Sequence, residues 1–524
     1  MRLRLRDRRH LAPGVAAFVA ASLVALLGLY ARAADSPRQT SGLVKLRLLG
    51  INDLHGHVEP PAEGLGGAAW LAADLDRATV PGRTIRVHAG DLVGASPLAS
   101  AWFHDEPSIE AANRIGFDVA TLGNHEFDEG VGELRRLLGG GQRTDAGAFE
   151  RDAGGRLVNT SAAGFPGARF PYTSANVTDA DGELLLRPYE IVERAGVRIG
   201  FIGVTTPTAP RYLLPRFAGD FRFGDMSDAV NRQVTELRRR GVEAIVVLAH
   251  AGAPSQQGGG SRASGQVMDE ARQMSDAVDV VVAGHSHTEL NLRVGGKLVV
   301  ESLSYGTAFD QVDMTVDRAT GDVVAKRAVI PRTLHAGLAP DAEVERLLAG
   351  YRERLRPLAE RVVGEAAGSL SAPTGLGRIA AEAQRRLAKA DVGLVDAGSF
   401  RARIDAGPIT YAELFATQAY DHPLVRMELT GRQLSGVLDA KLYVAGVQDV
   451  DPGATYSVVA NVLLTDAGPF PVLRSAARRG RELGSQVEAL ASYVEGLDAP
   501  LRPTRSDPLK AVSGAPSYVC LVPV

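Results

Sequence analysis

Five short polar clusters in the first 290 residues carry side-chain types that bind metal ions or transfer protons. They are Asn52-Asp53-Leu54-His55, Gly90-Asp91, Gly123-Asn124-His125-Glu126, His250 and Gly284-His285-Ser286-His287. The candidate metal ligands among them are two carboxylates, one amide and four imidazoles: Asp53, His55, Asp91, Asn124, His250, His285 and His287. A mixed nitrogen and oxygen set without sulfur suits divalent Zn, Mn, Fe or Co better than Ca or Cu(I).

The number of these donors predicts a pair of ions. Seven side chains exceed what one tetrahedral or octahedral ion needs, and they suit two ions that share a bridging carboxylate, which we assign to Asp91. Two metals about 3.5–4 Å apart clamp the attacking and leaving oxygens of a phosphoryl transfer. Taken singly, Asp91 could be a helix cap and His250 the end of a strand. Five such clusters in this order favour a dinuclear site.

The elements that must position these clusters are strands, because each cluster directly follows an apolar run. The runs that predict buried strands are Leu43–Leu49, Thr84–Val87, Val119–Leu122, Val197–Val204, Ala244–Leu248 and Val278–Val282. Helical periodicity fits Ala68–Arg77, Ile109–Ile115, Gly132–Leu138 and Met226–Arg240. The alternation predicts a layered α/β architecture, a β-sandwich flanked by helices. Ligands gather at the carboxyl ends of strands in such folds, so we expect the five clusters to converge.

A second, smaller α/β unit is expected after Pro340. Asp341–Glu360 is charged and strongly helical, and we read residues 336–365 as a connector between a first domain at 43–335 and a second at 366–500. Within the second domain the pattern predicts helices at Arg378–Ala388 and Tyr411–Phe415, and strands at Val392–Val395, Leu424–Leu429 and Tyr456–Val462. The proline-rich tail, 501–524, is expected to be irregular.

The first 34 residues have the pattern of an export signal. Five arginines precede an apolar run from Gly14 to Tyr30, and Ala31-Arg32-Ala33 follows as a small-x-small cleavage site. We expect cleavage after Ala33 or Ala34 and a periplasmic or secreted protein, with an uncleaved membrane anchor as the alternative.

Charge and cysteine content exclude other classes of protein. The formal net charge of the 524 residues is −3, which gives no basic footprint for a nucleic-acid polymer or an anionic membrane surface. Cys520 is the only cysteine, so neither an intrachain disulfide nor a thiolate metal cluster is possible. Phosphate handling must therefore rely on metal ions or a few arginines, and no protein partner is predicted.

The order D-x-H, G-D, G-N-H-E, H and G-H-x-H resembles the calcineurin-like metallophosphoesterase superfamily, and the forms around Asn52 and Gly123 resemble its 5′-nucleotidase branch. The likeness covers roughly Leu43 to Arg332. It implies that one ion is held by Asp53, His55, Asp91 and His287, and the other by Asp91, Asn124, His250 and His285. It also implies that His125 and Asp128 form a catalytic dyad, in which Asp128 orients the imidazole and His125 stabilises the phosphoryl transition state.

The second unit resembles the 5′-nucleotidase C-terminal domain, which reads the nucleoside. Gly407-Pro408-Ile409-Thr410-Tyr411 and Glu428-Leu429-Thr430-Gly431 carry the likeness. It implies that the substrate is bound by two arginines, two stacking aromatics and a histidine: Arg378, Arg401, Tyr420, Phe470 and His422. The chain departs from the family pattern at His422, where the family has a base-binding Asn, and at Gly468, where it has a ribose-binding Asp.

These patterns predict a hydrolase that cleaves nucleotides or related small phosphate esters with two divalent ions. The alternatives are a 2′,3′-cyclic-nucleotide phosphodiesterase or nucleotide-sugar hydrolase on the same site, a thiosulfohydrolase, and a secreted metal-binding protein without catalysis. The pair His125 and Asp128 argues against the last of these, because a structural metal site has no use for a transition-state stabiliser.

Overall fold

A computed structural model describes residues 42–143, 164–211, 213, 217, 219–253, 264–419, 421–438, 442–447 and 449–504. The expected export signal, residue Tyr420 and all of the tail beyond residue 504 lie outside this range. Within it, none of the helices has both the length and the apolar character needed to cross a membrane.

The first of two six-stranded sheets has the order β14-β13-β1-β2-β3-β4. Its strands are β1 (Leu43–Ile51), β2 (Thr84–His88), β3 (Val119–Thr121), β4 (Tyr172–Thr173), β13 (Asp310–Asp317) and β14 (Val323–Val329). Strands β1 to β4 are parallel, whereas β13 and β14 form an antiparallel pair at one edge. The three strands that precede the first three polar clusters are therefore neighbours in one sheet.

The second sheet has the order β11-β12-β10-β9-β7-β6. Its strands are β6 (Tyr189–Arg194), β7 (Val197–Thr205), β9 (Ala244–His250), β10 (Val280–Ala283), β11 (Glu289–Val294) and β12 (Lys297–Ser302). Strands β7, β9, β10 and β12 are parallel, and β6 and β11 are antiparallel at the edges. Of the last two polar clusters, His250 is the final residue of β9 and the other follows β10, and these two strands are adjacent.

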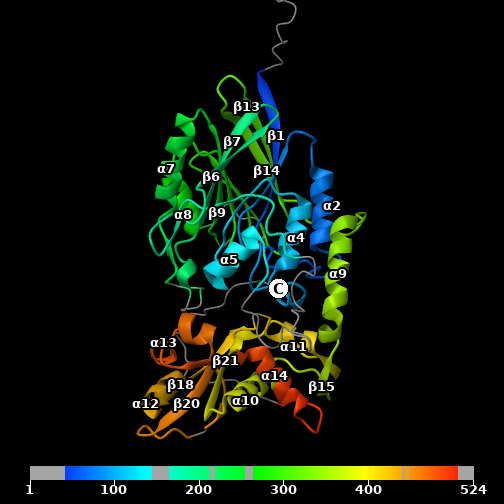
Figure 1. Ribbon diagram of the computed structural model, residues 1–524, viewed down its shortest axis with the longest axis vertical. Coiled ribbons are helices and arrows are strands. Elements are labelled where there is room, and N and C mark those ends of the chain that lie inside the picture. The colour runs from blue at the N-terminus through cyan, green and yellow to red at the C-terminus, as the bar shows by residue number, and fades with distance from the viewer. Residues whose placement is uncertain are drawn as a thin grey trace, which may run out of the picture. The chain divides into compact units, whose positions relative to one another are not determined.

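The two sheets pack face to face as a sandwich because their strands bury apolar residues on both faces. In β1, Val44, Leu46 and Leu48 lie between the sheets, while Leu49 and Ile51 face the helices outside. The outer face of the first sheet is covered by α2 (Ala68–Ala78), α4 (Glu106–Ile115) and α5 (Gly130–Gly139), and that of the second by α7 (Met226–Arg239) and α8 (Gln266–Gln273) (Figure 1). The expected sandwich flanked by helices is confirmed.

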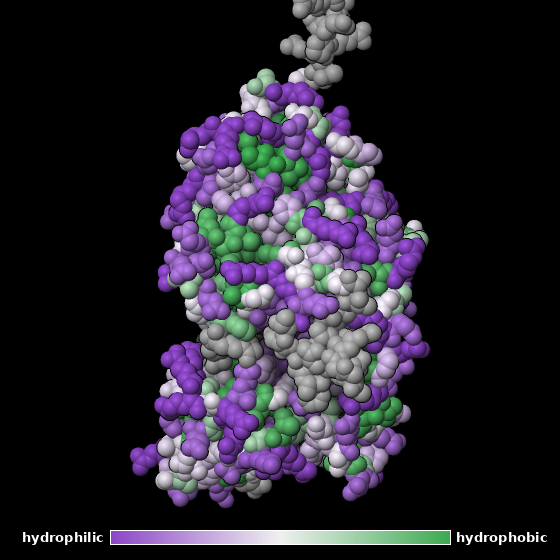
Figure 2. Space-filling view, viewed as in Figure 1, coloured by the Kyte–Doolittle hydropathy of each residue, from purple (hydrophilic) through white to green (hydrophobic). Residues whose placement is uncertain are grey.

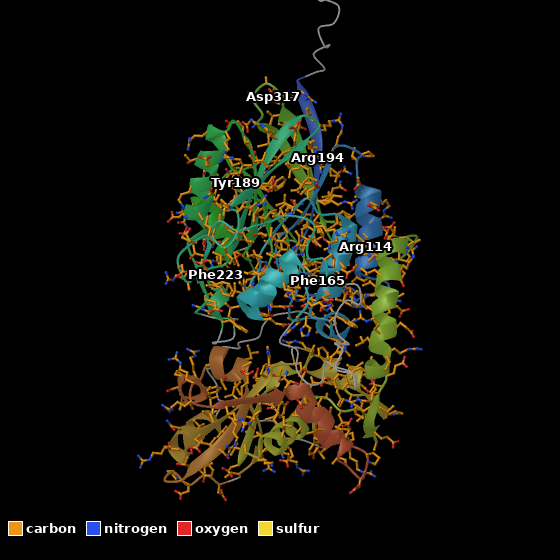
Figure 3. The ribbon with its side chains drawn as sticks, in the orientation of Figure 1. Arg114, Phe165, Tyr189, Arg194, Phe223 and Asp317 are labelled. Carbon is orange, nitrogen blue, oxygen red and sulfur yellow. The ribbon has the colours of Figure 1, made fainter. Side chains whose placement is uncertain are left out.

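Polar contacts close the edges of the sandwich. Arg194 of β6 donates to the carbonyl of Thr84 at 3.0 Å and pairs with Asp118, so it joins the second sheet to the first (Figure 3). At another edge, Asn291 of β11 donates to the carbonyl of Ala328 in β14 at 3.0 Å. Hydrophilic residues cover most of the face shown in Figure 2, with the hydrophobic residues in separate patches.

The C-terminal part contains a five-stranded sheet of order β19-β16-β20-β18-β21. Its strands are β16 (Val392–Asp396), β18 (Pro423–Thr430), β19 (Leu442–Gly446), β20 (Thr455–Asn461) and β21 (Arg481–Ser485). Its helices are α10 (Leu376–Ala388), α11 (Tyr411–Thr417), α12 (Gly431–Leu438), α13 (Pro471–Ala477) and α14 (Gln486–Glu495), and a π-helix spans Leu463–Ala467. This is the expected smaller α/β unit.

The expected connector is the helix α9 (Ala342–Ala359), which is capped by Asp341 through bonds to the backbone N–H groups of Glu343 and Val344. Strand β15 (Val362–Ala366) follows and pairs with β17 (Gly407–Thr410). Residues 362–365, which we expected in the connector, thus take part in a sheet with the second unit. Leu501 also forms a parallel β-bridge with β15, so paired backbone is found past residue 500.

Candidate functional site

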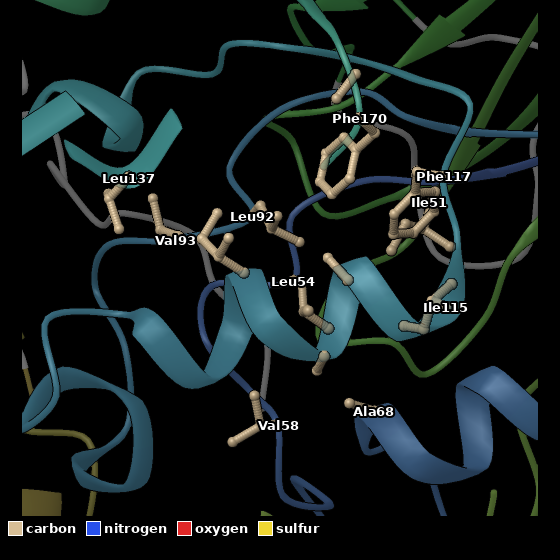
Figure 4. Close-up of a cluster of buried hydrophobic side chains, with 14 of the residues drawn as sticks. Ile51, Leu54, Val58, Ala68, Leu92, Val93, Ile115, Phe117, Leu137 and Phe170 are labelled. Atoms are coloured by element: carbon tan, nitrogen blue, oxygen red, sulfur yellow. The ribbon is translucent and has the colours of Figure 1, made fainter. Parts of the chain in front are cut away.

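The five polar clusters converge at the carboxyl ends of β1, β2 and β3 in one sheet and of β9 and β10 in the other. Apolar residues between the polar ones hold these loops in place. Leu54, which separates Asp53 from His55, is fully buried, and so are Leu92 and Val93 after Asp91. Figure 4 shows these side chains in one cluster with Ile115 of α4. The apolar neighbours thus anchor these loops in the hydrophobic cluster, while the polar residues between them are buried at the site.

One group of donor atoms comprises Asp53, His55 and His287, which lie within 4.8 Å of one another. The Nε2 atoms of His55 and His287 are 3.1 Å apart, and Asp53 Oδ1 lies 3.3 Å from His287 Nε2. His55 Nδ1 lies 2.9 Å from the carbonyl of Gly94, which directs Nε2 toward this group.

A second group comprises Asp91, His250 and His285. His250 Nε2 lies 3.0 Å from Asp91 Oδ2 and 3.1 Å from Asn124 Oδ1, and its Nδ1 lies 2.9 Å from the carbonyl of Ala89. Asp91 Oδ2 also lies 3.6 Å from His55 Nε2, so it stands between the two groups. The structure thus brings all seven predicted ligands together.

These donors fit divalent ions. The facing Nε2 atoms of His55 and His287 can form only one hydrogen bond between them, in which one ring donates and the other accepts. A cation between the two rings would instead be bound by the lone pairs of both nitrogens. Among the described residues, the side-chain amide nitrogen of Asn124 and Nδ1 of His287 are buried without a hydrogen-bond partner. The amide oxygen of Asn124, a better metal ligand than its nitrogen, is the atom that faces His250.

The backbone at the site is strained. Five of the seven candidate ligands have a left-handed backbone, with φ of 49° at Asp53, 49° at His55, 55° at Asp91, 76° at His285 and 53° at His287. Non-glycine residues adopt this conformation rarely, at a cost of about 1–3 kcal/mol each, and such strain concentrates at functional sites. The folded core must therefore hold these loops in a conformation that the isolated peptides avoid.

Charges within the site oppose the effect of burial. Burial alone would raise the pKa of Asp53 and Asp91, but the neighbouring histidines, His287 for Asp53 and His250 for Asp91, lower both pKa values below the ordinary range. Burial would likewise lower the pKa of His250, but the charge of Asp91 raises it to about 9. Burial lowers the pKa of His285 to about 4, and His250 adds to that effect.

His125 and Asp128 form a pair at the edge of this site. His125 Nδ1 lies 2.7 Å from Asp128 Oδ2, and both belong to a turn of 3₁₀-helix at His125–Phe127 and its C-cap. The backbone N–H of His125 donates to Asp91 Oδ1 at 2.8 Å, which places the imidazole beside the candidate bridging carboxylate. His125 also forms a third donor group with His55 and Asp91, so its position is compatible with a ligand as well as with an acid–base group.

Glu126 is a residue of the site to which the sequence assigns no role. Its carboxyl accepts N–H bonds from Gly123 at 2.5 Å, Asp91 at 3.0 Å and Leu92 at 2.8 Å, and thereby joins the loops after β2 and β3. Burial and the charge of Asp91 raise the pKa of Glu126 to about 7. A Cβ on Gly123 would lie 2.0 Å from Asp91 Oδ1, so only glycine fits there.

His57 and Tyr305 stack on each other beside the first donor group, with ring centroids 3.8 Å apart. Tyr305 follows β12, and its backbone N–H donates to the carbonyl of Asp53 at 2.8 Å. Its ring lies 6.0 Å from that of His55 and 5.4 Å from that of His287. No local motif marks Tyr305, because it is close to these histidines only in the folded chain.

The predicted substrate-binding residues lie on separate elements of the C-terminal part. Arg378 is exposed on α10, and Arg401 is exposed with its Nη1 donating to the carbonyl of Gly398 at 2.8 Å. His422 is half-buried before β18, and burial lowers its pKa to about 4. Phe470 is half-buried and packs against the core beside α13, while Tyr420 lies outside the described residues.

Two family models match the chain. Residues 46–289 match the calcineurin-like phosphoesterase model, and residues 361–460 match the model of the 5′-nucleotidase C-terminal domain. Residues 46–289 therefore form a calcineurin-like phosphoesterase domain, and residues 361–460 form a 5′-nucleotidase C-terminal domain, as the sequence motifs predicted.

Individual relatives agree with this placement. The chain is 31% identical over 518 residues to endonuclease YhcR of Bacillus subtilis, an alignment that covers 89% of this chain but only 41% of the relative. It is 26% identical over 501 residues to a 5′-nucleotidase of Vibrio cholerae, covering 86% of this chain and 84% of that protein. The crystal structure of a 5′-nucleotidase precursor from Thermus thermophilus has the same fold, with a TM-score of 0.65 at 24% identity, covering 88% of this chain and all of that one.

Proposed function

We propose that this protein is an extracytoplasmic, metal-dependent phosphoesterase that hydrolyses nucleotides or related small phosphate esters. The observation that carries the proposal is the convergence of seven nitrogen and oxygen donors beside the His125–Asp128 pair. We assign Asp53, His55, Asp91 and His287 to one divalent ion, and Asp91, Asn124, His250 and His285 to the other. When bound, such ions polarise the phosphoryl group and lower the pKa of water.

The residues of the chain supply the rest of the chemistry. Asp128 accepts the Nδ1–H of His125, which fixes the tautomer of the ring and favours the imidazolium. His125 can then stabilise negative charge on the phosphoryl oxygens and give a proton to the departing oxygen. Hydrolysis breaks one P–O bond and forms another with the oxygen of water; the alcohol gains its proton from His125, which is reprotonated by a proton released from that water.

A phosphate-release screen tests the proposal. The protein, stripped of metal and reloaded with Mn, Zn, Co or Fe, is offered nucleoside monophosphates, cyclic nucleotides and nucleotide sugars. We expect cleavage of at least one of these classes, detected as free phosphate for the monophosphates and as phosphomonoester products by chromatography for the other two, and its loss on chelation. A protein that binds both ions tightly but cleaves none of them would contradict the proposal and favour a non-catalytic role.

A second candidate is hydrolysis of phosphodiesters in nucleic acid, favoured by the likeness to an endonuclease. The net charge of −3 argues against it, because polymer binding relies on neutralising many phosphates with Lys and Arg. Adding a single-stranded and a double-stranded oligonucleotide to the screen separates the two. We expect mononucleotides to be cleaved with the higher kcat/KM.

Metal binding should release a proton at neutral pH. In the metal-free protein the pKa of His250 is about 9, above its ordinary value of 6.5, so at pH 7 its ring is protonated and ion binding at Nε2 requires loss of that proton. We expect the apparent affinity to rise by up to about tenfold per pH unit until pH approaches 9, and then to level off. Calorimetric titration with Zn at pH 7, in two buffers of different ionisation enthalpy, counts the protons. His285, whose pKa is about 4, contributes none.

The substrate preference should be broad among nucleobases. An added Cβ at Gly468 would lie 2.2 Å from the carbonyl oxygen of Leu464, so the Asp that binds ribose in the family cannot stand there without rearrangement of the π-helix. Stacking by Tyr420 and Phe470 then remains, worth about 1–3 kcal/mol per ring, and it accepts any flat base. We expect kcat/KM for AMP and UMP to differ by less than about tenfold, against the roughly 10⁴-fold that hydrogen-bonded recognition gives.

The control for this preference is a small aliphatic phosphate, compared in wild type and Tyr420→Ala. We expect the variant to lose activity on AMP and UMP but not on the aliphatic ester. If the aliphatic ester is cleaved as well as AMP by both proteins, the aromatic residues do not bind substrate and belong to the core.

A further inference from the structure

The residue between two of the proposed ligands, Ser286, is the centre of a partly buried hydrogen-bond network. Its hydroxyl lies 2.9 Å and 2.8 Å from the two carboxyl oxygens of Glu301, and 3.0 Å from the hydroxyl of Thr288. The backbone N–H of Ala253 donates to the same hydroxyl at 3.2 Å. Glu301, near the end of β12, is wholly buried. We call Ser286, Thr288, Glu301 and Ala253 the Ser286 network.

This network joins two loops that carry proposed ligands. Ala253 belongs to the loop after His250, and its carbonyl accepts the hydroxyl of Thr288 at 3.2 Å in addition to the bond from its own N–H. Glu301 accepts the backbone N–H of Thr288 at 3.3 Å. The loop after β9 and the loop after β10 are thus held together by residues that are not themselves proposed ligands.

The backbone of Gly252 packs directly against Ser286. A Cβ added to Gly252 would lie 2.4 Å from Ser286 Cβ, closer than real Cβ atoms approach. Since the φ of Gly252 is not in the left-handed region, the constraint there is space and not backbone conformation. An alanine at this position would displace Ser286 without removing any hydrogen-bonding atom of the network.

The two histidines beside Ser286 need such a restraint. The left-handed φ angles of His285 and His287, 76° and 53°, cost about 1–3 kcal/mol each and persist only where the surroundings fix them. Asp53 fixes His285 through bonds of 3.0 Å and 2.8 Å to its backbone N–H. Burial raises the pKa of Glu301 well above its ordinary value, which favours the neutral acid, a form able both to donate and to accept.

We infer that Ser286 and Glu301 are positioning residues, which set His285 and His287 relative to His250 and so determine how tightly both ions bind. This rests on the assignment of these histidines as ligands in the proposed function. Residues that orient metal ligands change metal affinity by about 10- to 100-fold when they are replaced. The network acts on the ions through the backbone of the two loops, and neither residue contacts substrate.

The test is a metal titration of the full chain after removal of metal by a chelator. The dissociation constants for Zn and Mn are measured for wild type, Ser286→Ala, Glu301→Ala, Glu301→Gln and Gly252→Ala, together with the melting temperature of each metal-free protein. We expect Ser286→Ala, Glu301→Ala and Gly252→Ala to bind metal about 10- to 100-fold more weakly. Glu301→Gln should stay within about threefold of wild type, because its amide also donates and accepts.

The matched controls are Ser227→Ala and Glu270→Gln. Ser227 and Glu270 are buried residues of α7 and α8. The Ser227 hydroxyl donates to Asp225 at 2.8 Å and its backbone N–H donates to Glu270 at 3.0 Å, and neither side chain is hydrogen-bonded to a proposed ligand. The two substitutions should lower the melting temperature without changing the metal affinity. Should Ser286→Ala and Gly252→Ala both bind metal as tightly as wild type, the inference is wrong, and a wild type that binds no metal overturns it as well.

The titration separates this inference from the proposed function. A wild type that binds two ions but cleaves no phosphoester contradicts the proposed reaction, while weaker binding by the variants still supports the positioning role. The opposite result, full phosphoesterase activity in wild type and unchanged metal affinity in both Ser286→Ala and Gly252→Ala, contradicts the positioning role but leaves the proposed reaction standing.

Discussion

Asp91→Asn is expected to lower the metal content from close to two ions per chain to well below one. It should also lower kcat/KM by roughly 10³-fold or more, because the ions contribute several kcal/mol of transition-state stabilisation. Asp91 is the one carboxylate that lies between the two donor groups, with Oδ2 at 3.0 Å from His250 Nε2 and 3.6 Å from His55 Nε2. The measurement is metal content by mass spectrometry alongside steady-state kinetics.

Asparagine is the informative substitution at this position. It tolerates the left-handed backbone of Asp91, whose φ is 55°, and its side-chain oxygen can still accept the N–H of His125. The change therefore removes the charge and little else. His287→Ala serves as the comparison, since it should lose mainly one ion. If Asp91→Asn retains two ions, or if both variants lose the same single ion, Asp91 does not bridge.

His125→Ala is expected to lower kcat by about 10²–10⁴-fold while the metal content stays near two per chain. The reason is the bond of 2.7 Å between Nδ1 and Asp128, which prepares the ring to donate a proton. Asp128→Asn should act in the same direction with a smaller loss, because the ring remains but its tautomer and charge are no longer favoured.

The leaving group distinguishes acid catalysis from metal retention. An alkoxide such as the one released from AMP needs a proton as it departs, whereas 4-nitrophenolate does not. The loss in His125→Ala should therefore be much smaller for 4-nitrophenyl phosphate than for AMP. A loss that is equal for both substrates and accompanied by a fall in metal content would mean that His125 is a ligand, as its place in a donor group with His55 and Asp91 allows.

The sequence alone predicted the parts of the site that depend on local chemistry. Buried strands are runs of apolar residues, so β1, β2, β3, β9 and β10 could be placed, and each polar cluster stood directly after one of them. The pair His125 and Asp128 was implied by the family resemblance, and its spacing of three residues on one turn explains why the two side chains meet. The donor types alone predicted the class of ion.

What no local pattern could show is which strands pair. Periodicity marks a strand but not its partner, and the edge strands β11 and β14, whose residues are mostly only partly buried or exposed, were not predicted. The assignment of β1, β2 and β3 to one sheet and of β9 and β10 to the other likewise follows from the packing of two apolar faces.

The supporting residues of the site were decided by the tertiary structure alone. Glu301 follows His287 by fourteen positions in an ordinary hydrophobic strand, and only the antiparallel return of β12 beside β11 brings it under Ser286. Tyr305 likewise reaches the site only in the folded chain. The left-handed backbone at five ligands also depends on the fold, because this conformation is unfavourable for each residue by itself. The sequence determined which atoms could bind metal and which proton donor lies beside them. The packed core decided how closely they meet, because only its burial energy can hold strained loops from two sheets in one place.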